Sequence, residues 1–424
     1  MDNPPETSPP PTSVVIIGGS NAGLGVSHAL LKDLLPHAAI QVTLINPSSE
    51  YYFNIAAPRV LAYPANDPWS IPEDKYIYSI PTLFQAYPPD AFRFVEGSAE
   101  RVDPVAKTVT VTLKGNSEVL KYDYLVIASG STTASTIGKH SFQAPFKPPQ
   151  PRGGGNGNGN GNDAGGDLRA LIANTQAALR RAKSVIVGGA GPVGVEFIAE
   201  LAEAFARRSP EEAVSEEKGV ELTLLSSTAQ ILPLLPPKSQ SAALLALETK
   251  GILVKTNSSV SSAEFHPTRN NWSVALSSGE TLVADVYISA TGCIPNNQFI
   301  PREWLDAQGW VDVDETLRVV ENGESPCVGV YALGDISSHA ARVLMRVPPQ
   351  VATVVAGIKG EVLQEEAAVV PPYLAKAQWD MMFVPVGRYT GTGRVEGYTL
   401  WGWMVALVKG RDFLVGRVMA YIGG

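Results

Sequence analysis

Short apolar runs alternate with helical patterns along the chain. Residues 14–17 are four consecutive β-branched residues, which is typical of a short strand buried on both faces. Glycines follow, and residues 23–35 then show the apolar spacing of a helix. A second apolar run at residues 40–45 completes a strand–helix–strand unit, so the pattern predicts an α/β fold.

The same order of elements recurs about 170 residues later in the chain. Residues 184–208 predict a strand, a turn and a helix, and residues 221–227 predict the next strand. Residues 92–115 alternate apolar and polar positions, as an antiparallel meander does. Further strands are predicted at residues 124–128, 285–290 and 327–335, and a helix at residues 346–364.

Both predicted helices follow a glycine-rich turn that could bind a pyrophosphate. Such a turn presents backbone N–H groups at the positive end of a helix, and glycine lets a phosphate approach the backbone. The first turn contains Gly18, Gly19, Ser20 and Gly23, with serine at the middle position of G-x-G-x-x-G. The second turn satisfies the motif completely with Gly189, Gly191 and Gly194. Alone, the first turn is equally compatible with an ordinary α/β turn.

Two strands end in uncharged polar residues where a ribose could bind. Asn46 ends the strand at residues 40–45, where an acidic residue is the usual ribose ligand. Ser226 lies at the end of the strand at residues 221–227, and no carboxylate is present there. A carboxylate would favour NADH, so Ser226 leaves both NADH and NADPH open, and an ordinary strand end is an equal alternative.

Glycines end three other strands and mark further places where backbone could meet a ligand. They are Gly130, Gly292 and Gly334. Asp335 follows the last of them and carries a carboxylate to the edge of the predicted sheet, where it can accept a hydrogen bond from a hydroxyl.

Composition excludes some classes of function. The 424 residues are 45% hydrophobic and suffice for two or three domains. A formal net charge of -8 argues against nucleic acid as a partner, because phosphate binding needs a concentrated basic surface. The first 13 residues lack the apolar core of a signal peptide, and no apolar run approaches the ~20 residues that span a bilayer. A cytoplasmic protein is expected, and no metal site is indicated.

The chain has two cysteines, Cys293 and Cys327, which lie 34 positions apart in the sequence. This spacing provides neither a disulfide framework nor a C-x-x-C redox pair. A buried, inert thiol is expected at position 293.

Two segments have unusual compositions. Residues 145–167 are rich in glycine, asparagine and proline, which predicts a flexible loop. Residues 398–424 combine two tryptophans with Lys409, Arg411 and Arg417 against a single acid. This C-terminal pattern is compatible with a dimer interface, a lid over a cofactor, or a segment that contacts a membrane surface.

The chain resembles the flavoproteins with two Rossmann-like dinucleotide-binding domains of the glutathione-reductase type. The resemblance rests on the two glycine loops, the segment ISATGCIPN and the terminal Gly-Asp strand. The segments VGRYTGTG and LVKGRDFLVGR are similar to the C-terminal region of the apoptosis-inducing-factor-like (AMID, ferroptosis suppressor protein) group, whose cousins are the type II NADH dehydrogenases. The expected limits are a disordered tail (1–12), an FAD-binding domain (13–140 and 284–365), an NAD(P)H-binding domain (168–283) and a C-terminal region (366–424).

The resemblance implies FAD at the first glycine loop and NAD(P)H at the second. It places Asn46 at the adenosine ribose of FAD, Asp335 at the ribityl chain or pyrophosphate, and Arg59 and Gly130 close by. It places Glu196 near the nicotinamide, and Gly292 and Pro295 in the cleft between the cofactors. Glu196 could handle protons, but it could equally be a carboxylate aligned with the dipole of its helix.

The expected activity is transfer of hydride from NAD(P)H to FAD and then of electrons to a quinone or dioxygen, without a redox-active disulfide. One alternative is a biosynthetic flavoenzyme that oxidises or cyclises a small metabolite. Another is a redox-controlled signalling or interaction protein. Ser20, Asn46 and Gln350 depart from the family pattern, since Gln350 lies near the place where group members often carry a lysine.

Overall fold

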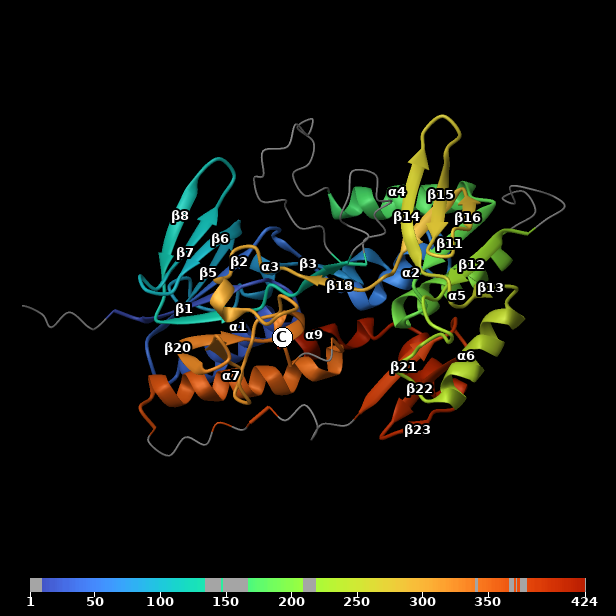
Figure 1. Cartoon of the computed structure of the whole chain (residues 1–424). Coiled ribbons are helices and arrows are strands. Elements are labelled where there is room, and N and C mark those ends of the chain that lie inside the picture. Colours follow the sequence, from blue (N-terminus) through green and yellow to red (C-terminus); the bar gives the residue numbers. More distant parts are fainter. Residues whose placement is uncertain are drawn as a thin grey trace, which may run out of the picture.

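Two parallel sheets form the two halves of the protein (Figure 1). The computed structural model describes residues 10–133, 146–147, 167–208, 219–339, 342–365, 370, 372–373 and 380–423. Each half contains a strand, a glycine turn and a helix in succession, so the α/β architecture with two Rossmann-like units is confirmed. The greater part of the loop expected at residues 145–167 lies outside the described residues.

The first sheet has six strands in the order β19-β20-β9-β1-β2-β5. They are β1 (Thr12–Ile17), β2 (Ile40–Asn46), β5 (Phe92–Glu96), β9 (Tyr124–Ile127), β19 (Arg318–Glu321) and β20 (Ser325–Ala332). Every neighbouring pair is parallel except β19 and β20. Thr12 already belongs to β1, so the tail expected at residues 1–12 is one residue too long. Residues 1–9 lie outside the described part.

The second sheet has four parallel strands in the order β13-β12-β11-β17. They are β11 (Ser184–Gly188), β12 (Glu221–Leu225), β13 (Leu253–Lys255) and β17 (Val286–Ser289). Because β17 pairs with β11, the chain stays in the second half up to Ser289. The boundary expected at residue 284 is therefore one strand too early. The apolar pattern of β17 fits a strand of either sheet, which explains the error.

Antiparallel strands complete both halves and connect them. The two meanders are β6 (Ser98–Asp103), β7 (Thr108–Thr112) and β8 (Ser117–Lys121), and β14 (Val260–His266), β15 (Asn271–Leu276) and β16 (Thr281–Ala284). A short hairpin pairs β3 (Glu50–Tyr52) with β4 (Ile77–Ser79). The strands β10 (Ser131–Thr133) and β18 (Cys293–Pro295) form a two-stranded ribbon through which the chain leaves each sheet for the other half.

Helices pack on the sheets and against one another across the two halves. In the first half they are α1 (Asn21–Leu34), α2 (Ala57–Ala62), α3 (Ile80–Leu83) and α7 (Val347–Val362), and in the second half α4 (Leu168–Arg181), α5 (Pro192–Ala206) and α6 (Pro237–Thr249). The helices α1 and α7 pack together below the first sheet (Figure 1). Helix α2 packs against α4 and α5, so it joins the first half to the second.

The C-terminal region is attached to both halves. Its strands β21 (Met381–Pro385), β22 (Gly391–Val395) and β23 (Tyr398–Thr399) form a sheet that contacts α5 and α6. The helix α8 (Gly402–Val405), a π-helical turn (Ala406–Gly410) and α9 (Val418–Ile422) follow. Helix α9 packs on α1, and the buried side chains of Phe413, Val418 and Ile422 join the core.

Candidate functional site

The first glycine loop is shaped by close backbone packing. Gly18 has a φ of +113°, and a Cβ there would lie 2.3 Å from the carbonyl oxygen of Ala128. A Cβ on Gly23 would lie 1.8 Å from the carbonyl oxygen of Gly18. Glycine is therefore required at both positions, so that strand β1 and helix α1 can meet at the turn.

The second loop repeats this geometry. Gly189 has a φ of +112°, and a Cβ there would lie 2.5 Å from the carbonyl oxygen of Ala290. A Cβ on Gly194 would lie 1.9 Å from the carbonyl oxygen of Gly189. Gly191 differs, because an added Cβ would meet no atom within 4 Å. No contact with the described residues thus requires glycine at 191, which borders open space at the N-terminus of α5, where the pyrophosphate of NAD(P)H is predicted.

Ser20 occupies the corresponding middle position of the first loop. It is exposed, and it is the N-cap residue of α1 without a side-chain capping bond. The backbone N–H of Gly19 donates a hydrogen bond of 2.8 Å to Asn46 Oδ1, and Asn46 Nδ2 donates to the carbonyl of Ser48. The Asn46 side chain therefore ties the glycine loop to the end of β2, at the edge of the sheet where its ribose contact is predicted.

Ser226 lies at the end of β12, as predicted, but its side chain is buried. Its hydroxyl donates a hydrogen bond of 2.8 Å to the carbonyl of Gln230. The neighbouring residues Ser227 and Thr228 are exposed. In this arrangement Ser226 shapes the loop after β12, and the choice between NADH and NADPH stays open.

The Gly-Asp strand end lies against the ribbon that connects the halves. Gly334 has a φ of +75°, and its N–H donates to the buried Gln350 Oε1 at 2.8 Å. The Asp335 carboxylate accepts hydrogen bonds from Ser131 Oγ at 3.2 Å and from Lys147 Nζ at 2.6 Å. Lys147 also donates to Ser131 Oγ. Asp335 is thus held at the sheet edge, and a lysine that the sequence analysis did not single out neutralises it.

Gly130 and Pro295 lie together at one end of the ribbon, since the residue after Gly130 pairs with Pro295, whereas Gly292 lies at the other end, where Cys293 pairs with Thr133. Gly130 and Gly292 both have positive φ values, of +67° and +97°. Cys293, in the same ribbon, is exposed and free, so the expectation of a buried thiol is wrong. Its partner strand β10 is buried, so the exposure is confined to the β18 side of the ribbon.

Glu196 lies in the first turns of α5 and is only 3% exposed. Lys409 Nζ, from the C-terminal region, donates to Glu196 Oε1 at 2.5 Å. Burial raises the pKa of the Glu196 carboxyl, and the Lys409 ammonium acts in the opposite direction. Glu196 is therefore held in a buried ion pair, and its place near the nicotinamide stays a prediction.

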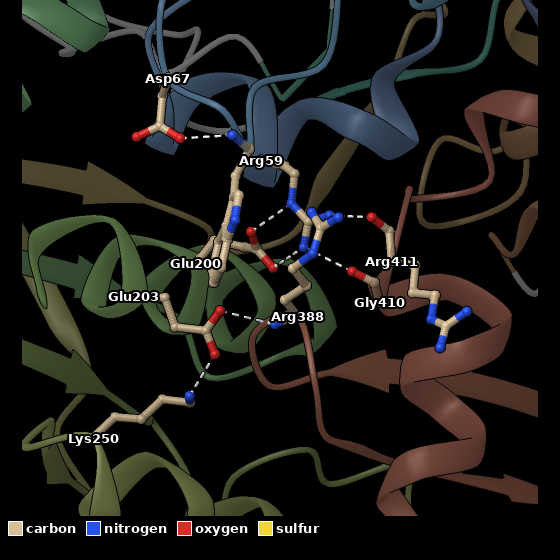
Figure 2. Close-up of polar contacts among 9 residues, drawn as sticks. Arg59, Asp67, Glu200, Glu203, Lys250, Arg388, Gly410 and Arg411 are labelled. Carbon is tan, nitrogen blue, oxygen red and sulfur yellow. Dashed lines mark hydrogen bonds and ion pairs between the residues drawn. The ribbon is translucent and has the colours of Figure 1, made fainter. Parts of the chain in front are cut away.

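Arg59 is buried at the contact between the two halves. Its guanidinium donates from Nε and Nη2 to the two carboxylate oxygens of Glu200, each at 2.7 Å (Figure 2). Further donors of its guanidinium reach the carbonyls of Gly410 and Arg411. Arg59 thus forms part of a buried junction, and its proximity to FAD stays a prediction. The buried carboxylate of Glu200 requires such a partner.

The sequence analysis missed Glu200, Lys147 and the partner of Glu196. Glu196 and Glu200 are spaced four apart on a largely apolar helix, and this spacing puts both carboxylates on one face. Two carboxylates on a buried face need two cationic side chains from other segments as partners. This requirement could have identified Arg59 and Lys409 as those partners. No comparable signal marks Lys147, which lies beside a segment without helical or strand periodicity.

The C-terminal region exposes aromatic side chains. Trp401 and Trp403 are 70% and 60% exposed, and their rings stack with centroids 6.4 Å apart. Tyr398 and Leu407 are also exposed nearby in the chain. Within the described part of the chain, no helix is both long and apolar enough to cross a bilayer.

Comparison with known proteins identifies related chains. A family model described as pyridine nucleotide-disulphide oxidoreductase matches residues 12–356. Oxidoreductase ptaL of Pestalotiopsis fici is 32% identical over 399 residues, which cover 93% of this chain and 95% of that protein. Oxidoreductase phnG of Penicillium herquei is 34% identical, with coverage of 96% and 95%. The structure of NDH2 from Plasmodium falciparum in complex with NADH is similar with a TM-score of 0.65 and 16% identity, covering 97% of both chains, so that likeness concerns the fold.

Proposed function

Because the chain belongs to the pyridine nucleotide-disulphide oxidoreductase family, we propose that it binds FAD and a nicotinamide coenzyme and oxidises or cyclises a small-molecule metabolite. In the oxidation, two electrons pass from the metabolite to FAD and from the reduced flavin to NAD(P)+, and NAD(P)H reduces the same flavin in the reverse direction. The observation that carries this proposal is the likeness to ptaL and phnG over nearly the full length of all three chains. Both relatives are named oxidoreductases without mention of a quinone. The likeness to NDH2 lies at 16% identity and supports the shared fold alone.

The described residues fit both coenzymes. The open space at Gly191 and the N-terminus of α5 would hold the pyrophosphate of NAD(P)H, and the matching turn before α1 would hold that of FAD. Asp335, oriented by Lys147 and Ser131, would accept hydrogen bonds from the ribityl hydroxyls of FAD. When bound, FAD supplies the centre that exchanges hydride with the nicotinamide.

The chain itself supplies no second redox centre of the disulfide type. Cys293 and Cys327 are both free, and burial raises the pKa of the Cys327 thiol to about 11. A thiol with so high a pKa is a poor nucleophile at neutral pH. Electrons therefore pass directly between flavin and substrate under this proposal.

We assign Glu196 and Lys409 a role in proton handling beside the coenzymes. Burial raises the pKa of the Glu196 carboxyl, and the Lys409 ammonium opposes this shift, so the two effects compete within one buried ion pair. A carboxyl group balanced in this way suits a general acid or base.

A second candidate function is an AMID-type quinone reductase that contacts a membrane. The exposed, stacked Trp401 and Trp403 favour it, because aromatic rings beside basic residues suit the boundary between water and lipid. The same surface could serve a dimer or a redox-controlled interaction. Dioxygen is a further acceptor to be tested.

The experiment is a cofactor and acceptor assay on the purified protein. We expect a yellow protein whose flavin is released on denaturation, is bleached by NADH or NADPH under anaerobic conditions, and is not reoxidised efficiently by a short-chain quinone. A colourless protein without flavin would contradict the proposal. Rapid quinone turnover, increased by lipid vesicles, would instead establish the second candidate.

A further inference from the structure

A buried junction joins three segments of the chain around Arg59. The guanidinium comes from α2 of the first half, its carboxylate partner Glu200 from α5 of the second half, and the accepting carbonyls of Gly410 and Arg411 from the C-terminal region (Figure 2). The bonds to these carbonyls are 2.7 and 2.6 Å long. The side chains of Arg59 and Glu200 are 1% and 0% exposed.

The position of Glu200 makes this junction relevant to coenzyme geometry. Helix α5 begins directly after the second glycine loop, so its placement fixes the placement of that loop. Helix α2 belongs to the half that contains the first glycine loop, and it packs on α5. A contact between α2 and α5 therefore links the two loops through rigid helices.

We propose that Arg59 is a positioning residue, which holds α5 and the C-terminal turn on the first half so that the two coenzyme sites keep the separation that hydride transfer needs. The proposal rests on the use of FAD and NAD(P)H, and it is independent of the second substrate.

Neighbouring ion pairs of α5 reinforce the same arrangement. Lys409 binds Glu196 one turn before Glu200, and Glu203 accepts from Lys250 Nζ at 2.6 Å and from the backbone N–H of Arg388 at 2.9 Å. The C-terminal region thus meets α5 at both neighbouring carboxylates, Glu196 and Glu203. Figure 2 shows the contacts of Glu203 beside the pair of Arg59 and Glu200. Among these partners of the α5 carboxylates, Arg59 is the one that comes from the first half.

The chemistry of the site demands a guanidinium. Its planar fork matches a carboxylate bidentately while further N–H groups reach the two carbonyls. The Arg59 guanidinium also lies over the ring of Phe413, with Cζ 4.9 Å from the ring centroid. A lysine has three donors on a single nitrogen and cannot span these acceptors, so Arg59→Lys keeps the charge but loses part of the junction.

The test compares two variants with the wild-type holoenzyme. Arg59→Lys keeps a cation opposite Glu200, and Arg59→Met with Glu200→Leu removes both charges together, because deletion of one partner alone would leave a buried charge unpaired. Arg169→Met is the matched control, since Arg169 also binds two carboxylates across the halves, Glu50 and Glu73, but on the surface.

The readouts are flavin content, hydrogen exchange of residues 402–413 and α5, and the limiting rate and Kd of anaerobic flavin reduction by NADPH and NADH. We expect both junction variants to retain flavin, to lose amide protection in residues 402–413, and to show a limiting rate lowered about 10- to 100-fold with a smaller change in Kd. The Arg169→Met control should match the wild type.

Three outcomes would overturn the proposal. They are a wild-type limiting rate in both junction variants, loss of FAD from folded junction variants, and failure of both variants to fold, which would make the pair a requirement for folding. If the wild-type protein itself is not reduced by NAD(P)H, the proposed function fails, whereas the hydrogen-exchange arm still reports on the junction.

Discussion

Replacement of Gly191 by tryptophan separates coenzyme binding from folding. Gly191 is the N-cap residue of α5 with φ -76° and ψ -177°, a conformation open to any residue, and an added Cβ meets no atom within 4 Å. The cost in folding free energy should therefore stay within about 1 kcal/mol, the typical effect of an N-cap replacement. The indole would instead fill the space against which the pyrophosphate of NAD(P)H would lie.

The expected loss of affinity follows from the hydrogen bonds that the indole prevents. A hydrogen bond to a charged group is worth about 1.5–3 kcal/mol, so the loss of two such bonds to the pyrophosphate weakens binding by about 3–6 kcal/mol. This corresponds to an increase of about 10²- to 10⁴-fold in Kd. Stopped-flow measurement of flavin reduction at increasing NADPH and NADH gives this Kd, and absorbance gives the flavin content.

Gly194→Ala is the matched comparison, because its Cβ would lie 1.9 Å from the carbonyl oxygen of Gly189. That variant should lower the melting temperature, whereas Gly191→Trp should not. Unchanged Kd values for both coenzymes in Gly191→Trp would refute the assignment of the second loop to NAD(P)H. Loss of FAD from the folded variant would refute the assignment of FAD to the first loop.

Three further predictions concern other parts of the chain. Burial lowers the pKa of His28 from 6.5 to about 4, so between these pH values the unfolded chain binds a proton that the folded chain does not. The free energy of unfolding should therefore fall by up to about 3 kcal/mol from pH 7 to 4. Melting curves should show a smaller loss over this range for His28→Phe, and the same loss as the wild type for His37→Gln at an exposed position. Lys147→Met should raise the Kd of FAD about tenfold in a fluorescence titration, and an unchanged Kd would contradict a role for this lysine at the flavin. Joint replacement of Trp401 and Trp403 by serine should reduce co-sedimentation with anionic vesicles without slowing flavin reduction, and undiminished sedimentation would refute membrane contact through these rings.

Local patterns were sufficient for the glycine loops. The positive φ values of Gly18 and Gly189 and the tight contacts of Gly23 and Gly194 arise within a single strand–turn–helix unit, so a short window of sequence contains the signal. Asp335 could be placed at a sheet edge for the same reason, since it directly follows a buried strand.

Long-range pairings could not be read in this way. Arg59 and Glu200 are 141 positions apart, and nothing in the segment around Arg59 distinguishes a ligand of a phosphate from a partner of a buried carboxylate. The exposure of Cys293 and the membership of β17 in the second sheet likewise depend on which strands pair. Such tertiary pairings decide the environment of a residue after its local structure is set.

Anaerobic titration of the purified protein with NADPH or NADH, followed by flavin absorbance, tests the central claim most directly. The account predicts that about one equivalent of coenzyme per flavin completes the reduction, because one hydride carries two electrons and the chain offers no disulfide to take more. A protein without flavin, a flavin that NAD(P)H does not bleach, or consumption of a second equivalent before reduction is complete would contradict it.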